Sequence, residues 1–392
     1  MKKNNYSTVI DFGCDVLRLC VFNNDSKNIF SISKEIFDKN DINEYSKSLD
    51  SLIRSAEKKI SSHLDNIIVL YDHSEFHSID LSIKKEFDQP INLKDTYYSL
   101  IMEANLLITN NYVKDKIVHL ITVKSEVDGE EFSENFIDDK KIKSIVIELK
   151  FLCLNWDRYK NISNIFKKNN LQIINLYCSS YIKSFSYINY FNKKKNLTFL
   201  DIGWERSTII SYKNNRAIFF SSIPIGGNHI TKDISKVLKL TLTESEKIKK
   251  TFNKSEIEFS FDQKLDNSKK NLVQQIIGKK ISVDLLKKVV LARVEEIISL
   301  SLKNISYSED SKTNINSTLV LTGNGSNLFD KNSFHFDLKY NFKEISFYEE
   351  NDSEICAAGY NFDVKEFNEM KLINKSKKKL GFFEKFFNLF SR

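Results

Sequence analysis

The chain has 392 residues, of which 41% are hydrophobic and only two are proline, and its formal net charge is +7. This length and composition predict a folded protein with two large domains or four subdomains, and exclude an extended linker protein. No run of about 18 uncharged apolar residues is present, and the first residues lack the apolar core of a signal peptide. We therefore expect no membrane-spanning helix and a cytoplasmic location.

Charge and cysteine content exclude further classes. The lysines are spread along the chain without a nucleic-acid-binding motif, so we expect no nucleic-acid partner. The five cysteines lack Cys-x-x-Cys spacing, which argues against a disulfide framework and a zinc site. We expect four of them to be small core residues. His73 and His119 lack a second ligand at metal spacing and are interpreted as packing residues.

The first half of the chain predicts one α/β unit with an insertion. Residues 6–22 indicate a strand, a tight turn and a second strand, and a helix and a strand are expected over 44–64 and 66–71. This order is typical of an RNase-H-like half. From 77 to 150 the pattern changes to one helix followed by two long strands, which indicates an inserted subdomain.

The chain then returns to the first unit and crosses to a second half. The elements expected up to the crossing are a helix at 158–169, a strand at 171–177 and a connecting helix at 178–190. An apolar run at 197–202 and an alternating strand at 207–212 then predict a second strand pair. This pair repeats the opening pattern of the chain.

Helices dominate the remainder. The expected elements are helices at 230–238, 242–252 and 283–306, weak strands at 257–261 and 273–276, a strand at 317–321 and a small-residue helix at 356–360. Thr243, three residues ahead of Glu246, is the expected N-cap of the second helix.

Two strand pairs share an unusual turn. Asp11 and Asp201 each lie near the end of an apolar strand and are followed two residues later by Gly13 and Gly203. Such a turn places a carboxylate beside backbone N–H groups that a ligand can approach closely, which suits a Mg²⁺-bound phosphate. Two copies half a molecule apart predict two related domains whose turns face one nucleotide. The glycine-rich turn at 323–327 would contact the same nucleotide from a third side.

These motifs resemble the actin, Hsp70 and sugar-kinase superfamily, with 11–21 as first phosphate motif, 201–211 as second and 319–328 as adenosine motif. More narrowly, the chain resembles the FtsA family of bacterial cell-division actin homologues. The segments that carry this narrower resemblance are 223–234, 244–249 and 292–297. The resemblance implies an actin-like ATPase fold, α/β in class, with two RNase-H-like halves and an FtsA-type 1C insertion.

The resemblance also implies a subdomain division. It comprises 1A (1–77 and 151–193), 1C (78–150), 2A (194–235 and 313–364), 2B (236–312), a linker (365–379) and an amphipathic membrane-targeting helix (380–392).

An ATP and Mg²⁺ site between the halves is a further implication, with Asp11 and Asp201 holding the metal through water. The residues assigned to this site are Asp11, Gly13, Cys14, Arg18, Asp201, Gly203, Ser207, Gly226, Gly227, Glu246, Lys249, Gly323, Asn324 and Gly325. Glu246 and Lys249 would lie by the ribose and adenine, and a solvated charged helix face is an equal alternative for them.

The second phosphate turn departs from the family pattern. Trp204, Glu205 and Arg206 stand where the superfamily usually has Gly-Gly-Thr. Bulk and negative charge thus replace bare backbone near the expected γ-phosphate. We expect ATP to bind, hydrolysis to be slow or absent, and the nucleotide to act as a conformational ligand.

The tail concentrates aromatic residues on one helical face. The residues on this face are Leu380, Phe382, Phe383, Phe386, Phe387 and Phe390. The lysines at 375–379 precede them, so the tail is expected to bind anionic lipids as a peripheral anchor. By resemblance, the location is the cytoplasmic face of the inner membrane at the division septum.

Several partners and two other functions follow from the resemblance. The FtsZ C-terminal peptide is expected on 2B, near Lys249, Lys250, Lys279 and Lys280. Other division proteins are expected on 1C, and self-association into filaments is also expected. A PilM-like pilus-assembly protein and a small-molecule kinase remain alternatives. The kinase would need a general base and a sugar surface that the sequence does not reveal.

Overall fold

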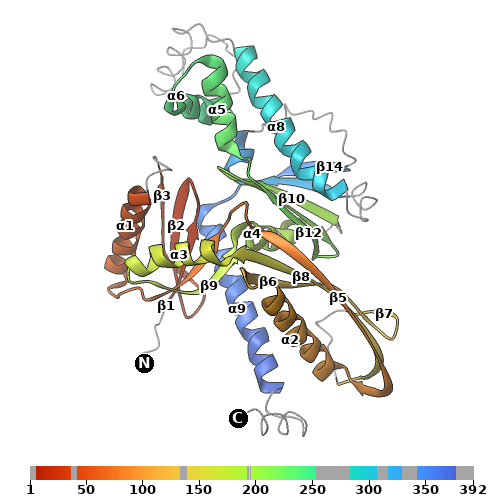
Figure 1. Ribbon diagram of the computed structural model, residues 1–392. Helices are drawn as coiled ribbons and strands as arrows, with labels where there is room; N and C mark the ends of the chain where they lie inside the picture. The colour runs from red at the N-terminus through yellow and green to blue at the C-terminus, as the bar shows by residue number, and fades with distance from the viewer. Residues whose placement is uncertain are drawn as a thin grey trace.

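The computed structural model describes residues 6–36, 42–132, 139–191, 194, 196–252, 283–306, 317–328 and 342–376. Three sheets organise this part of the chain (Figure 1). Two have five strands each, in the orders β3-β2-β1-β4-β9 and β12-β11-β10-β13-β14, and the third has four strands in the order β5-β8-β6-β7.

The first sheet forms the expected N-terminal half. Its strands are β1 (Tyr6–Phe12), β2 (Val16–Asn23), β3 (Asn28–Glu35), β4 (Asn66–Tyr71) and β9 (Gln172–Cys178). β1 pairs antiparallel with β2 and parallel with β4, so the turn after β1 and the end of β4 lie at one edge. The helices α1 (Ile42–Ile60) and α3 (Trp156–Lys168) accompany it, and α1 buries residues three and four apart, such as Leu49, Leu52 and Ala56.

The second sheet repeats this topology. Its strands are β10 (Asn196–Ile202), β11 (Ser207–Lys213), β12 (Arg216–Ile223), β13 (Thr318–Thr322) and β14 (Glu344–Phe347). β10 pairs antiparallel with β11 and parallel with β13, as β1 does with β2 and β4. The expected repetition of one strand pair in two related halves is therefore confirmed.

Two helices join the halves into one core. These are α4 (Ser179–Tyr187), which continues into the 3₁₀ helix η2 (Ile188–Phe191), and α9 (Asp352–Ser376). Side chains from both sheets and both helices form one buried cluster, for example Leu70, Tyr181, Phe199 and Cys356. A Cβ on Gly359 would lie 2.8 Å from the Leu70 side chain, so the small residues of α9 permit this close packing.

α9 continues beyond its expected end. It runs through Ser376, so the stretch expected to be a linker from residue 365 begins as helix. In Figure 1 the helix projects away from the sheets toward the C-terminus. The tail face at 380–390 lies outside the described residues. No helix in the described part of the chain is long and apolar enough to cross a membrane.

The insertion after β4 has a core of its own. Its elements are β5 (His77–Asn92), α2 (Leu93–Asn111), β6 (Asp115–Val127), β7 (Glu130–Glu131) and β8 (Lys141–Asn155). Residues such as Leu100, Ala104 and Ile147 form this core. β8 continues out of it, since Leu152 and Leu154 belong to the central cluster. The long strand β5 was not expected from the sequence.

Three helices pack together beside the second sheet. They are α5 (Gly227–Leu238), α6 (Leu242–Phe252) and α8 (Val283–Ser306), and their apolar residues share a cluster with Leu200 and Leu321. The strands expected at 257–261 and 273–276 lie outside the described residues.

The expected cap of α6 was wrong. The cap is Thr241: its hydroxyl accepts from the Glu244 backbone N–H at 3.2 Å, and the Glu244 carboxylate accepts from the Thr241 N–H at 2.8 Å. A reciprocal capping box therefore lies two residues before the expected one.

The prediction that four of the cysteines are core residues is confirmed, since four are buried and Cys14 is half-buried.

Candidate functional site

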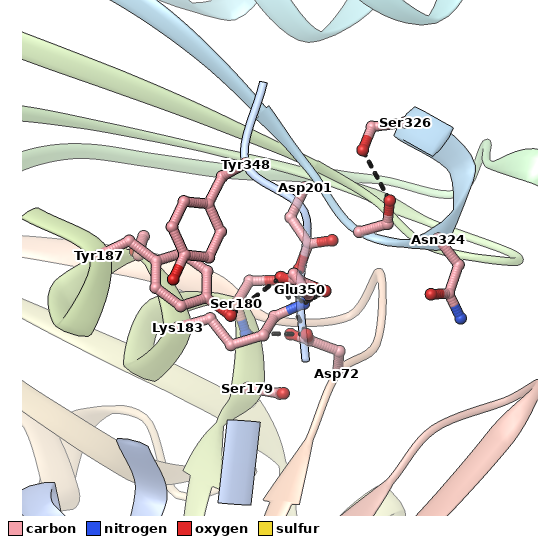
Figure 2. Close-up of polar contacts among 12 residues, drawn as sticks. Asp72, Ser179, Ser180, Lys183, Tyr187, Asp201, Asn324, Ser326, Tyr348 and Glu350 are labelled. Carbon is pink, nitrogen blue, oxygen red and sulfur yellow. Dashed lines mark hydrogen bonds and ion pairs between the residues drawn. The ribbon is translucent and has the colours of Figure 1, made fainter. Parts of the chain in front are cut away.

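The predicted turns meet between the two halves. A cavity of about 60 Å³ lies where β1, β4, β10 and β13 end. Of the predicted residues, those that line it are Asp11, Gly13, Cys14, Arg18, Asp201, Gly203, Gly323 and Asn324. Asp15, whose carboxylate the sequence also places near the phosphates, lines the cavity too. Lining residues that the sequence did not reveal are Asp72, Ser179, Lys183 and Glu350, and Figure 2 shows them gathered around Asp201.

The first aspartate is fully paired within the protein. One oxygen of Asp11 accepts from Arg18 Nη1 at 2.8 Å, and the other accepts from the Ser179 hydroxyl at 2.9 Å. Arg18 Nε also donates to Asp352 at the start of α9, at 2.5 Å. Asp11 and Arg18 are both buried, so this ion pair is shielded from solvent.

The second aspartate holds two cations on one oxygen. Asp201 Oδ2 lies 2.7 Å from Lys183 Nζ and 3.1 Å from Arg206 Nη2. Burial alone would raise the pKa of Asp201, but the Arg206 and Lys183 charges outweigh burial and hold this pKa below its usual range. Asp201 is therefore ionised and neutralised by protein groups.

Asp72 is the third carboxylate of the cluster. It follows β4 directly and accepts from the Ser180 backbone N–H at 2.8 Å, at the N-terminus of α4, and from Arg206. Burial raises the pKa of Asp72, and the Arg206 charge opposes this rise. Because β4 is parallel to β1, the carboxyl ends of the two strands share one sheet edge, which brings Asp72 beside the turn that follows Asp11.

Lys183 extends the cluster to Glu350. Its ammonium lies 3.0 Å from Glu350 Oε1 as well as 2.7 Å from Asp201 (Figure 2). Burial raises the pKa of Glu350, against the Lys183 charge. Three largely buried carboxylates, those of Asp201, Asp72 and Glu350, thus share two cations, Lys183 and Arg206.

Gly226 and Gly227 support the second turn instead of lining the cavity. The Gly227 N–H donates to Gly203 O at 2.9 Å, and a Cβ on Gly226 would lie 2.5 Å from the same oxygen. Ser207 is also engaged, since its hydroxyl donates to Ile225 O at 2.7 Å. These three predicted residues therefore shape the turn from behind.

Glu246 and Lys249 form a paired, largely buried group. Lys249 Nζ lies 2.7 Å from Glu246, donates to Gly227 O at 3.0 Å, and sits 4.6 Å from the Trp204 ring centroid. Glu246 also accepts from the Thr231 hydroxyl at 2.5 Å. The alternative of a solvated charged face is wrong for Lys249, which is only 5% exposed.

The glycine-rich turn after β13 packs on β10. Gly323 has φ +84°, and a Cβ there would lie 2.2 Å from Asp201 Oδ1. A Cβ on Gly325 would lie 2.4 Å from the Ile202 side chain. Asn324 reaches across the cleft and donates to Asp15 at 3.0 Å. The turn therefore closes the cavity and links the halves.

The cavity residues do not fit Mg²⁺-ATP in this arrangement. Small-molecule sites usually measure about 300–1,000 Å³, several times the cavity found here. Mg²⁺ needs near-octahedral oxygen ligands, whereas Asp11 and Asp201 already bind cationic side chains. No group of three His, Cys, Asp or Glu side chains in the described residues could hold a metal ion. The predicted water-mediated metal role of both aspartates is therefore unsupported by the geometry.

His119 is a core residue, as interpreted from the sequence. It is 2% exposed, and its Nε2 accepts from the Cys178 N–H at 2.9 Å. Burial lowers the pKa of His119 to about 3. Its ring therefore stays neutral and ties β6 to the residue just before α4.

Part of the chain is similar to one protein family. Residues 198–331 match the family model "Cell division protein FtsA". The Bacillus subtilis cell division protein FtsA is 22% identical over 209 residues, which cover 51% of this chain and 44% of that protein. The Neisseria meningitidis cell division protein FtsA is 30% identical over 130 residues, which cover 32% of this chain and 30% of that protein. The matched part thus spans less than half the length of these relatives.

A solved structure extends the likeness in fold. A chain of the PilM-PilN type IV pilus biogenesis complex matches with a TM-score of 0.55 and 13% identity, and 89% of each chain is covered. At this identity the likeness concerns the fold alone.

Proposed function

We propose that this chain, which resembles FtsA over part of its length and has the actin-like ATPase fold, polymerises and tethers FtsZ filaments to the inner face of the cytoplasmic membrane at the septum. The match over residues 198–331 carries this proposal. It includes the second phosphate turn, the helices α5, α6 and α8, and the turn after β13. Mg²⁺-ATP is left out of the proposal because the cleft residues do not fit it.

The C-terminal tail supports the membrane part of the proposal. Moving a Phe side chain from water to an apolar phase gains about 1.5–3 kcal/mol, and the tail has five on one face. Ordering a short helix opposes this gain, and each nearby lysine adds only about 1 kcal/mol on an anionic surface. A single tail therefore binds weakly. A filament that presents many tails binds firmly through avidity.

The exposed surface of α2 supports the partner role of the insertion. Large apolar side chains there are open to solvent: Met102, Leu106, Leu107, Tyr112 and Val113 are each at least 43% exposed. Such a group on one helix and its end suits a protein partner. We assign other division proteins or a neighbouring protomer to this surface.

The FtsZ peptide is assigned to the 2B helices, with a correction to the lysines. Lys249 is buried and already paired, so it cannot meet an acidic peptide. Lys250 is exposed and lies 3.1 Å from Glu35 on β3. Lys279 and Lys280 lie outside the described residues. The proposal therefore rests on the helices and on Lys250.

A liposome pelleting assay tests the anchor. Phe386→Glu with Phe387→Glu should abolish binding of the full chain to anionic vesicles, because charge on the apolar face prevents insertion. Gly381→Glu with Asn388→Glu is the charge-matched control, at positions that helical spacing places opposite the aromatic face, and should retain most of the binding. If the phenylalanine variant still pelleted, or both variants lost binding equally, the aromatic face would not be the anchor.

The pilus-assembly alternative rests on the fold likeness to the PilM-PilN complex. The same assay separates the two functions, since membrane binding through residues 376–392 is expected only of the tether. Deleting these residues should release the tether from vesicles and leave a pilus-type protein unchanged.

A further inference from the structure

Arg206 occupies the centre of the cleft. It belongs to the turn between β10 and β11, yet its side chain points inward and the residue is only 8% exposed. Nη1 donates to the Asp201 backbone carbonyl at 2.9 Å, while Nη2 contacts the carboxylates of Asp201 and Asp72. Since Asp72 follows β4 of the first sheet, Arg206 bridges the two halves.

The position of Arg206 leaves Asp201 no oxygen for a metal. Oδ2 already contacts Lys183, Arg206 and the Ser180 hydroxyl. Oδ1 has no hydrogen-bond partner among the described residues, but it faces the turn at Gly323, where a Cβ would come within 2.2 Å of it. A hydrated Mg²⁺ is far larger than a Cβ and cannot enter there.

The remaining charges disfavour a metal-free nucleotide. The cavity lining contains six carboxylates against three cations. The three cations, Arg18, Lys183 and Arg206, are each held by carboxylates. Glu205, which lines the cavity, is exposed and would face the phosphates. A polyphosphate would therefore lose its hydration shell and meet mainly negative charge.

Contacts across the cleft give the closed arrangement its own stability. Besides Arg206 with Asp72, Asn324 donates to Asp15 at 3.0 Å. Each of these two contacts joins a turn of the first half to a turn of the second half. Side chains of the protein therefore bridge the two halves directly.

We propose that Arg206, with Lys183, replaces the metal ion in this cleft, so that the halves are held closed by protein cations and the chain does not bind Mg²⁺-ATP. This proposal is independent of membrane tethering. It also differs from the expectation of nucleotide binding with slow turnover, because it places the defect at binding.

Binding and melting measurements on the full chain test the proposal. The wild-type protein should show no saturable binding of ATP in calorimetry, with or without millimolar Mg²⁺, and its Tm should not change with either. Saturable Mg²⁺-ATP binding, or a rise in the wild-type Tm with Mg²⁺, would overturn the proposal.

The variant Arg206→Thr tests the replacement directly. Removing the guanidinium leaves Asp201 and Asp72 short of a cation, so the Tm should fall well below wild type, and millimolar Mg²⁺ should restore part of the loss. Arg54→Thr removes an exposed arginine that pairs with Asp50 on the same helix. It should change neither the Tm nor the response of the Tm to Mg²⁺. A loss equal to that of the control, or no response of Arg206→Thr to Mg²⁺, would contradict the role given to Arg206.

Discussion

Gly323 and Gly129 have nearly the same backbone conformation in different surroundings. Their φ angles are +84° and +85°. A Cβ on Gly323 would lie 2.2 Å from Asp201 Oδ1 and 2.6 Å from Ile202 O, whereas nothing lies within 4 Å of one on Gly129. A side chain at Gly129 would therefore meet backbone strain alone, whereas one at Gly323 would meet the same strain and a steric clash.

We expect Gly323→Ala to lower the free energy of unfolding by about 2–4 kcal/mol, since strain and overpacking add. Gly129→Ala should lower it by only about 1 kcal/mol, from strain alone. Urea denaturation of both variants measures the difference. Equal losses would mean that the turn after β13 is not packed on β10 as described.

His119 should make the protein sensitive to acid. Its folded-state pKa of about 3 is lower than the ordinary value of 6.5, so folding favours the neutral ring. The stability that this provides is complete above pH 6.5 and is lost as the pH falls toward 3. His119→Gln, which keeps an acceptor for the Cys178 N–H, should therefore weaken the pH dependence.

The measurement is urea unfolding at pH 7 and pH 4.5. The wild type should lose about 2–3 kcal/mol more than His119→Gln between these two values. His63→Gln replaces an exposed histidine and should lose as much as the wild type. Parallel losses in all three proteins would contradict a neutral buried His119.

At the scale of elements, the capping box of α6 gives a matched pair of threonines. Thr241→Ala removes the hydroxyl that accepts from the Glu244 N–H and should cost about 1 kcal/mol. Thr243→Ala changes an exposed residue inside the first turn and should cost close to nothing. Thermal unfolding of both variants decides between the caps. A larger loss at Thr243 would restore the cap expected from the sequence.

Elements with local signals were predictable from the sequence, and elements with distant partners were less so. The strand pairs that open each half have apolar runs and a turn within about 20 residues. The hydrophobic periodicity and the turn residues are therefore enough to predict these pairs. β5 alternates exposed and half-buried residues around charged side chains such as Lys84 and Glu86. Its partner β8 begins at Lys141, and no local pattern reveals that pairing.

The same limit applies to the site. The aspartates and glycines of the turns were found because their own neighbours in sequence mark them. Arg206 and Asp72 are 134 positions apart, and Lys183 and Glu350 are 167 apart. The sequence of the turn showed that an arginine at position 206 departs from the family pattern. It did not show that the side chain points inward, because that direction depends on Asp72 at the end of another strand.

For the whole molecule, one core spans both halves, while the insertion has its own. Val9, Leu70, Phe199 and Val320 belong to the shared core, and Leu100 belongs to that of the insertion. Amides of β1, β4, β10 and β13 should therefore exchange with one common opening free energy. Those of α2 should open at lower cost. Native-state hydrogen exchange in low urea measures both, and separate openings of the two sheets would contradict a shared core.

The continuity of β8 and the His119 hydrogen bond couple the insertion mechanically to the cleft. β8 passes unbroken from the core of the insertion to the central core. β6, which pairs with it, carries His119, and His119 accepts a hydrogen bond from the Cys178 N–H. The next residues, Ser179 and Ser180, hold the carboxylates of the cleft. A load pulling on the far end of the insertion is thus delivered to the first turn of α4. If the chain polymerises as proposed, neighbouring protomers that pull on one another's insertions would strain one another's clefts without a diffusible signal.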